Sequence, residues 1–173
     1  MKSICGVEGV RATGIKEGKF GLALIEASGA AAGVFTSNLV RAPPVTLMEE
    51  RVKNGHLDAV IVNSGCANAY TGGQGYNDAI RMGEIAGHEL GIDPEYVGVA
   101  STGVIGRYLD LPRIEDQCRR IAPLLERSIQ AETHAARAIM TTDLTEKHAL
   151  VRGNGFSVGG ITKGSGMIAP NMG

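Results

Sequence analysis

The sequence predicts one mixed α/β domain over residues 1–173. A chain of this length can bury one hydrophobic core but is too short for two comfortable ones. Segments with the periodicity of strands and segments with the periodicity of helices follow one another without strict alternation, which favours a mixed fold over a doubly wound one. The sequence has 25 glycines in 173 residues, about twice the usual share of roughly 7%. They are scattered between apolar segments, which indicates tight turns and close backbone approaches.

The first 55 residues predict a hairpin followed by a short helix. Phe20–Ala27 and Ala32–Thr36 are apolar runs with Ser28-Gly29 between them, the pattern of two strands joined by a turn. Pro43-Pro44 suits the first turn of a helix, where a missing N–H is tolerated. We expect that helix to end at Asn54-Gly55.

A strand, a helix and a second strand come next. Leu57–Val62 is expected to be a strand that leads into a polar loop over 63–75. Asp78–Leu90 predicts a helix because its apolar residues recur at spacings of three and four, and Gly91 follows as a C-cap. Tyr96–Ala100 predicts another short strand.

The last third of the chain predicts two helices and two closing strands. Asp110 caps the first helix, whose inner face is a stripe with helical spacing: Ile114, Cys118, Ile121 and Leu125. Residues 129–140 predict the next helix, and His148–Val151 and Phe156–Ile161 predict the strands.

Composition and charge argue against several classes of function. The formal net charge is −1 with Lys and Arg dispersed, so we expect no nucleic-acid partner. No apolar run approaches the ~20 residues that span a bilayer, and the start of the chain lacks the apolar stretch of a signal peptide. The cysteines Cys5, Cys66 and Cys118 lack CxxC spacing and the four histidines lack metal-ligand spacing. We therefore expect no disulfide, no metal site and a reducing, cytoplasmic location.

Ser101-Thr102-Gly103 directly follow the strand expected over 96–100. Such a turn can direct a hydroxyl and a free backbone N–H into a cleft, the two donors of an oxyanion hole, although an ordinary strand-to-loop turn is the alternative. Cys66 as a nucleophile would need a histidine partner, and none stands in a recognisable Cys/His pattern. A buried structural thiol is the better interpretation of Cys66.

Two further polar segments can each be interpreted either as part of a functional site or as ordinary surface structure. Lys163 does not fit the phosphate-binding loop, because that motif needs Gly-Lys-Ser/Thr and Thr162 and Gly164 flank the lysine here. A lysine in this Gly-rich segment either reaches a carboxylate as a compact charge or is a solvated surface residue. Thr141-Thr142-Asp143 follow a helix directly, so they are either a polar exit or hydroxyls directed at a ligand.

Taken in order, these segments resemble the ornithine acetyltransferase family, the bifunctional glutamate N-acetyltransferases of arginine biosynthesis. The resemblance covers nearly the whole chain, and its last motif is the most specific. The motifs that carry it are Gly33-Val34-Phe35-Thr36, Ala42-Pro43-Pro44-Val45, Asn63-Ser64-Gly65, Ser101 to Gly106 (STGVIG), Ile139 to Asp143 (IMTTD) and Lys163 to Met172 (KGSGMIAPNM).

The resemblance implies an α-β-β-α sandwich similar to that of N-terminal-nucleophile hydrolases, made from two chains. In that family the precursor cuts itself before a Thr, which places the cleavage directly after Gly173 and makes residues 1–173 an α chain completed by a separate β chain. Gly173 stands where many members carry Ala, a small residue like glycine. The family suggests an α2β2 heterotetramer.

The resemblance also implies a reaction and roles for residues. An acetyl group would pass from N2-acetylornithine to L-glutamate by a ping-pong cycle through an acetyl-enzyme on the Thr of the β chain. The Thr102 hydroxyl and the Gly103 N–H would form the oxyanion hole, while Lys163 and one hydroxyl of Thr141 or Thr142 would bind the amino-acid end of the substrate. No cofactor is implied, and acetyl-CoA as a further donor stays open.

Two other functions remain compatible with the sequence. One is an N-terminal-nucleophile amidohydrolase or aminopeptidase on the same scaffold, since one fold hosts several activities. The other is a binding module without catalysis.

Overall fold

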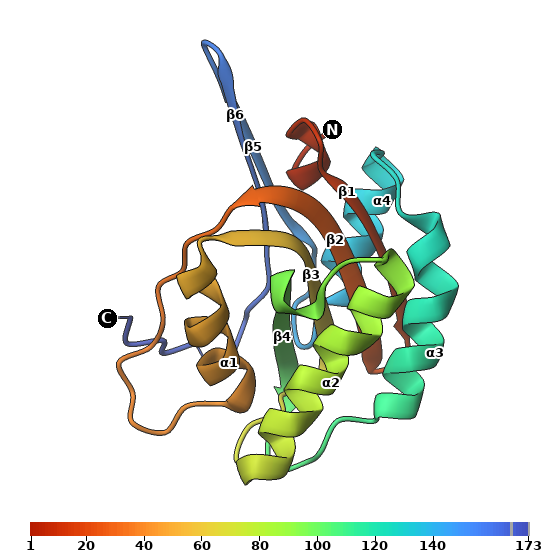
Figure 1. Ribbon diagram of the computed structural model, residues 1–173. Helices are drawn as coiled ribbons and strands as arrows, with labels where there is room; N and C mark the ends of the chain where they lie inside the picture. The colour runs from red at the N-terminus through yellow and green to blue at the C-terminus, as the bar shows by residue number, and fades with distance from the viewer. Residues whose placement is uncertain (167, 173) are drawn as a thin grey trace.

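The main sheet of the molecule has four strands in the spatial order β1-β2-β3-β4 (Figure 1). The computed structural model describes residues 1–166 and 168–172. The strands are β1 (Arg11–Glu17), β2 (Phe20–Ala30), β3 (His56–Cys66) and β4 (Val97–Val104). The pairs β1–β2 and β2–β3 are antiparallel, whereas β3–β4 is parallel, so the sheet is mixed and β4 lies at its edge.

Within the described residues, four α-helices pack around this sheet. They are α1 (Pro43–Arg51), α2 (Gly72–Leu90), α3 (Leu111–Ile121) and α4 (Ile129–Ala138). In Figure 1, α2 and α3 lie in front of the sheet and α4 lies behind it. The predicted mixed α/β class is therefore confirmed.

A second, two-stranded sheet is formed by β5 (Lys147–Gly153) and β6 (Phe156–Thr162), which pair antiparallel as a hairpin. Figure 1 shows this hairpin projecting from the body of the molecule, with β6 beside the short 3-10 helix Ile4–Gly6. The two closing strands that the sequence predicts are confirmed.

Apolar side chains form two clusters on opposite faces of the main sheet. Leu22 and Leu24 of β2 belong to the cluster with α2 and α3, whereas Ala23 between them belongs to the cluster with α4. This division follows from the alternation of side chains along a strand. On the α4 side the backbones are close, because a Cβ added to Gly14 would lie 2.6 Å from the carbonyl oxygen of His134. Small residues therefore decide how near α4 comes to the sheet.

The helices with clear local signals match their predictions. α1 begins at Pro43, and Gly55 after it adopts the left-handed conformation with φ of 71°. Asp110 caps α3 by accepting a hydrogen bond from the Arg113 backbone N–H at 3.3 Å. The stripe predicted for this helix and the turn after it is buried throughout, with exposures of 0–9% for Ile114, Cys118, Ile121 and Leu125.

The predicted hairpin around Ser28-Gly29 is wrong. Ser28-Gly29 lies inside β2, and the segment 32–36 forms no strand apart from one bridge between Thr36 and Met172. β2 instead pairs with β1 through the turn at Gly18, whose φ of 61° suits glycine. Ser28-Gly29 suits a turn in the sequence, but past a bulge Gly29 pairs with Leu57 of β3, and this pairing on one edge keeps the end of β2 extended.

Two neighbouring strands of the main sheet, β3 and β4, are longer than predicted. β3 continues to Cys66 and β4 to Val104, because the two segments pair in parallel with Ser64 opposite Thr102. Ser101-Thr102-Gly103 therefore lie in the last part of β4 rather than beyond a strand. α2 likewise begins at Gly72, before the predicted Asp78, where Gly75 fits tightly against Asn68 and Thr71.

Glu132 ties the N-terminus to α4. This side chain is fully buried, and its carboxylate accepts hydrogen bonds from the backbone N–H groups of Lys2 (2.6 Å), Ser3 (3.1 Å) and Cys5 (3.1 Å). Burial by itself would raise the pKa of Glu132, but these hydrogen bonds outweigh burial and hold the pKa below its ordinary value.

Among the described residues, no helix has both the length and the apolar character to cross a bilayer.

Glu132→Gln is expected to lower the free energy of unfolding by about 1–3 kcal/mol at pH 7, because three backbone donors lose a charged acceptor. The folded pKa is depressed, so this contribution is present above the ordinary Glu pKa of about 4.3 and is lost as pH falls through the folded pKa. Urea unfolding at pH 7 and at pH 3 measures it. Glu8→Gln, at an exposed position, is the control, and equal stabilities of the two variants at pH 7 would contradict the assignment.

Candidate active site

The Lys163 ammonium joins two threonine hydroxyls from distant parts of the chain. Its Nζ donates to Thr102 Oγ1 at 2.9 Å and to Thr141 Oγ1 at 2.8 Å. Thr102 lies near the end of β4, Thr141 lies in the loop after α4, and Lys163 directly follows β6. Three of the residues predicted for the site are thus brought together, and Lys163 is half-buried there.

Thr102 is placed to act as a hydrogen-bond donor. The Thr102 hydroxyl oxygen accepts a hydrogen bond from the Lys163 ammonium. The hydroxyl proton of Thr102 therefore remains available for another acceptor, such as a substrate oxygen. β4 is the edge strand of the main sheet, so backbone N–H groups on its open side have no strand partner among the described residues. A side-chain hydroxyl and a backbone N–H group can together supply the two donors that an oxyanion hole requires.

Gly103 has to be glycine for two reasons. Its φ of 134° is a conformation that side chains disfavour, and a Cβ at this position would overlap the backbone of Gly65 on β3. The paired glycines let β3 and β4 approach closely next to Thr102. The structure therefore constrains the position that the sequence analysis selected, while the oxyanion role stays a prediction.

The structure separates the two threonines that sequence alone could not rank. Thr141 contacts Lys163, whereas the Thr142 hydroxyl hydrogen-bonds the Ser165 hydroxyl at 2.8 Å. Only Thr141 of this pair shares the Lys163 ammonium with Thr102.

Asp143 organises the loop that carries Thr141. Its side chain is fully buried and pairs with Lys147, and it accepts from the backbone N–H groups of Gly164 (2.5 Å) and Thr141 (3.3 Å). Burial would raise the pKa of Asp143, but the Lys147 ammonium and the two N–H groups hold it well below its usual range. One carboxylate thus fixes the residue after Lys163 and the backbone of Thr141. The motif Thr141-Thr142-Asp143 gave no signal of this role.

A shallow cavity of about 240 Å³ lies at Lys163, which lines it together with Gly164, Gly166, Ile168, Ala169 and Pro170. Farther along, Asn171 hydrogen-bonds Ser37, so this segment runs beside the stretch before α1. The predicted cleavage position, Gly173, and Met167 of the last motif lie outside the described residues.

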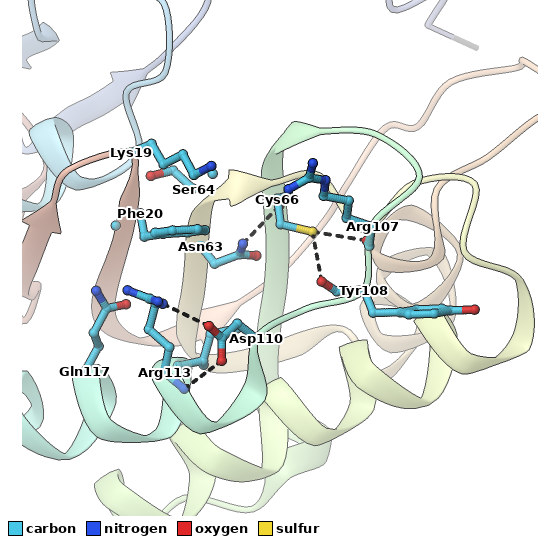
Figure 2. A pocket seen from close by; sticks show the side chains of 13 residues that line it. Lys19, Phe20, Asn63, Ser64, Cys66, Arg107, Tyr108, Asp110, Arg113 and Gln117 are labelled. Atoms are coloured by element: carbon cyan, nitrogen blue, oxygen red, sulfur yellow. Dashed lines mark hydrogen bonds and ion pairs between the residues drawn. The ribbon is translucent and has the colours of Figure 1, made fainter.

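A second cavity, of about 200 Å³, lies between the ends of β2 and β3, the segment after β4 and the start of α3 (Figure 2). Thr102, Thr141, Thr142 and Lys163 do not line it, so the candidate site is placed at Lys163 and not in this cavity. Figure 2 shows Cys66 here with its thiol directed at the backbone of Arg107 and Tyr108, to whose carbonyls it donates at 3.2 and 3.5 Å. The interpretation of Cys66 as a buried thiol is confirmed.

Comparisons with known proteins agree with the predicted resemblance. The model of the ArgJ family matches residues 7–173. The glutamate N-acetyltransferase of Methanosarcina mazei is 52% identical over 172 residues, which cover 98% of this chain and 44% of that protein. The chain therefore spans less than half the length of such curated relatives.

Two solved structures are similar over almost their whole chains. The ornithine acetyltransferase of Mycobacterium tuberculosis, solved as a complex with ornithine, has a TM-score of 0.95 and 34% identity, covering 99% of this chain and 96% of that one. The arginine biosynthesis bifunctional protein ArgJ of Bacillus halodurans has a TM-score of 0.89 and 38% identity, covering 99% and 94%. The fold is thus the one found in these two proteins.

Asp143→Asn is expected to lower the free energy of unfolding by about 1–3 kcal/mol, because the Lys147 ammonium loses its partner and one N–H group faces an amide in place of an acceptor. Denaturant unfolding at pH 7 measures this change. The matched control is Glu146→Gln, a carboxylate of the same loop whose partner Arg137 is exposed. If both variants lose the same stability, Asp143 does not organise the loop.

Proposed function

Since this chain belongs to the ArgJ family, we propose that it forms part of a glutamate N-acetyltransferase that moves an acetyl group from N2-acetylornithine to L-glutamate. The observation that carries the proposal is the Lys163 ammonium, which holds the hydroxyls of Thr102 and Thr141 together on one side of the main sheet. The names of the relatives, glutamate N-acetyltransferase and ornithine acetyltransferase, support acetyl transfer involving these two amino acids, and this cluster offers residues suited to it.

The proposed enzyme has a second chain. The curated relatives are more than twice as long as this chain, whereas the chain nearly fills the two solved chains it resembles. This difference supports a division of the family's proteins into two pieces of which this chain is one, an α chain. We propose that the partner, a β chain, begins with the nucleophilic Thr after self-cleavage and that two copies of each chain assemble.

The proposed cycle has two half-reactions. The Thr hydroxyl of the β chain attacks the acetyl carbonyl carbon of N2-acetylornithine, and the freed N-terminal amine of that Thr takes the proton. Collapse of the tetrahedral intermediate breaks the amide C–N bond, and the leaving nitrogen takes a proton as ornithine departs. The amine of glutamate then attacks the acetyl ester, which gives N-acetylglutamate and restores the Thr hydroxyl.

Residues of this chain serve both steps in the proposal. Negative charge develops on the carbonyl oxygen in each tetrahedral intermediate, and the Thr102 hydroxyl and the Gly103 N–H would stabilise it. An ammonium has three donors, and Lys163 uses two of them on Thr102 and Thr141. The third can bind a substrate carboxylate, so one lysine would link the oxyanion hole to the end that recognises the amino acid.

The reaction is tested with the product of the full-length gene. Incubation with N2-acetylornithine and glutamate is expected to yield ornithine and N-acetylglutamate in equal amounts, with the parallel double-reciprocal lines of a ping-pong mechanism. A parallel reaction with acetyl-CoA as donor decides whether that compound is also a substrate. Release of acetate without N-acetylglutamate would replace the proposal with an amidohydrolase.

Thr102→Ala in the full-length enzyme is expected to lower kcat by about 10²–10³, the cost of removing one oxyanion donor. Thr102→Ser keeps a hydroxyl and should retain most of the activity. Thr145→Ala, at an exposed threonine outside the site, is the control for the effect of losing a threonine. A Thr102→Ala enzyme that is as fast as the control would remove Thr102 from the oxyanion hole.

A further inference from the structure

Lys16, near the end of β1, directs its ammonium into the backbone behind the candidate site. Its Nζ donates to the Met140 carbonyl oxygen at 2.5 Å and to Ser64 Oγ at 2.7 Å, with the Lys19 carbonyl oxygen at 3.5 Å. All three donors of the ammonium thus face protein acceptors. No carboxylate among the described residues lies within ion-pair distance of Lys16.

The groups that Lys16 holds lead directly to Thr141. Met140 is the residue before Thr141, and Ser64 donates its own hydroxyl to the Ala138 carbonyl oxygen at 2.6 Å, at the end of α4. Lys16 and Ser64 therefore hold two of the last carbonyl groups around the end of this helix, where cations are favoured. The backbone that enters the Thr141 loop is fixed from β1 and β3.

This part of the sheet is shaped to admit the lysine. Gly21 lies opposite Lys16 in the β1–β2 pair, and a Cβ there would overlap the Ala138 carbonyl and lie 2.7 Å from Ser64 Oγ and 2.9 Å from the Lys16 side chain. Only glycine leaves room for the three groups to meet. The contact is thus part of how β1, β2 and α4 pack, and not a chance position of a surface side chain.

Lys16 is also electrostatically coupled to the site. Burial lowers the pKa of Lys16, the charge of Lys163 lowers it further, and Asp143 raises it. Asp143 pairs with Lys147, and neither Lys16 nor Lys163 forms an ion pair among the described residues, so this region favours a further anion. A substrate carboxylate is the anion that the proposed reaction brings there.

We propose that Lys16 is a positioning residue for the end of the site that binds the substrate amino acid, acting through the Met140 carbonyl on Thr141. The inference rests on the proposed function. The backbone of Thr102 is held in β4 by pairing with β3, whereas the Thr141 backbone directly follows the Met140 carbonyl that Lys16 holds. Loss of Lys16 should therefore disturb substrate binding at Thr141 and Lys163 more than stabilisation of the oxyanion at Thr102.

The test is the steady-state kinetics of Lys16→Met and Lys16→Arg in the full-length, two-chain enzyme, with N2-acetylornithine and glutamate as substrates. Lys16→Met should raise KM for glutamate by about 10-fold to 100-fold, the range for losing a hydrogen bond made by a charged group, while kcat changes much less. Lys16→Arg keeps the charge and donors and should restore most of the affinity. Lys19→Met is the matched control. The Nζ of Lys19 lies over Phe20, and the substitution keeps the Lys19 backbone carbonyl that Lys16 contacts.

Ser64→Ala is the second variant, and it keeps the charge of Lys16 while removing one of its anchors. It should raise KM for glutamate in the same direction, to a smaller extent. Kinetic constants of Lys16→Met equal to those of Lys19→Met would overturn the proposal. So would a loss of thermal stability in Lys16→Met with kcat falling as much as kcat/KM, or no change of KM in Ser64→Ala. The same assay on the wild-type enzyme separates the positioning role of Lys16 from the proposed function. If the wild-type enzyme does not transfer acetyl to glutamate, the proposed function itself is refuted.

Discussion

The candidate site depends on one ammonium that satisfies hydroxyls from two other segments. Lys163 follows β6, yet its contacts are Thr102 of β4 and Thr141 of the loop after α4. A lysine head group can hold both because its three donors are free to rotate around the end of a flexible stem. The arrangement persists only if each of the three segments is fixed independently. Much of the surrounding structure does this.

Each segment has its own restraint. β4 is held by parallel pairing with β3, where Gly103 and Gly65 approach too closely for any side chain. The Thr141 loop is held by the buried Asp143 carboxylate, which also takes the N–H of Gly164 next to Lys163. Buried polar groups of this kind stabilise a structure only when all their partners are present. Both oxygens of the Asp143 carboxylate have such partners, so this buried group can hold the Thr141 loop.

Glycine performs a task here that no other residue can. At Gly14 and Gly21 it brings α4 against the main sheet, and at Gly103 it brings two strands together. The high glycine content noted in the sequence is thus used for backbone contact around the site as well as for turns. The helix α4 then delivers the Thr141 loop at a distance that a larger residue would not allow.

Local chemistry made some elements predictable. The Asp110 cap, the apolar stripe of α3 and the Gly91 C-cap rest on contacts within a few residues, and all three are present in the structure. The hairpin predicted at Ser28-Gly29 is wrong because pairing with β3 keeps that segment extended. Motif order alone indicated the family and the candidate residues Thr102, Thr141, Thr142 and Lys163.

The tertiary structure decided how these residues relate to one another. It separated Thr141 from Thr142, gave Asp143 its part in the loop and brought Lys16 to Met140, 124 positions along the chain. No periodicity or spacing carries such information, because the contacts join segments that are neighbours only after the sheet has formed. Sequence by itself determined the elements with local caps and the identity of the polar motifs. Packing of α4 and pairing of β3 with β4 determined which of those motifs meet.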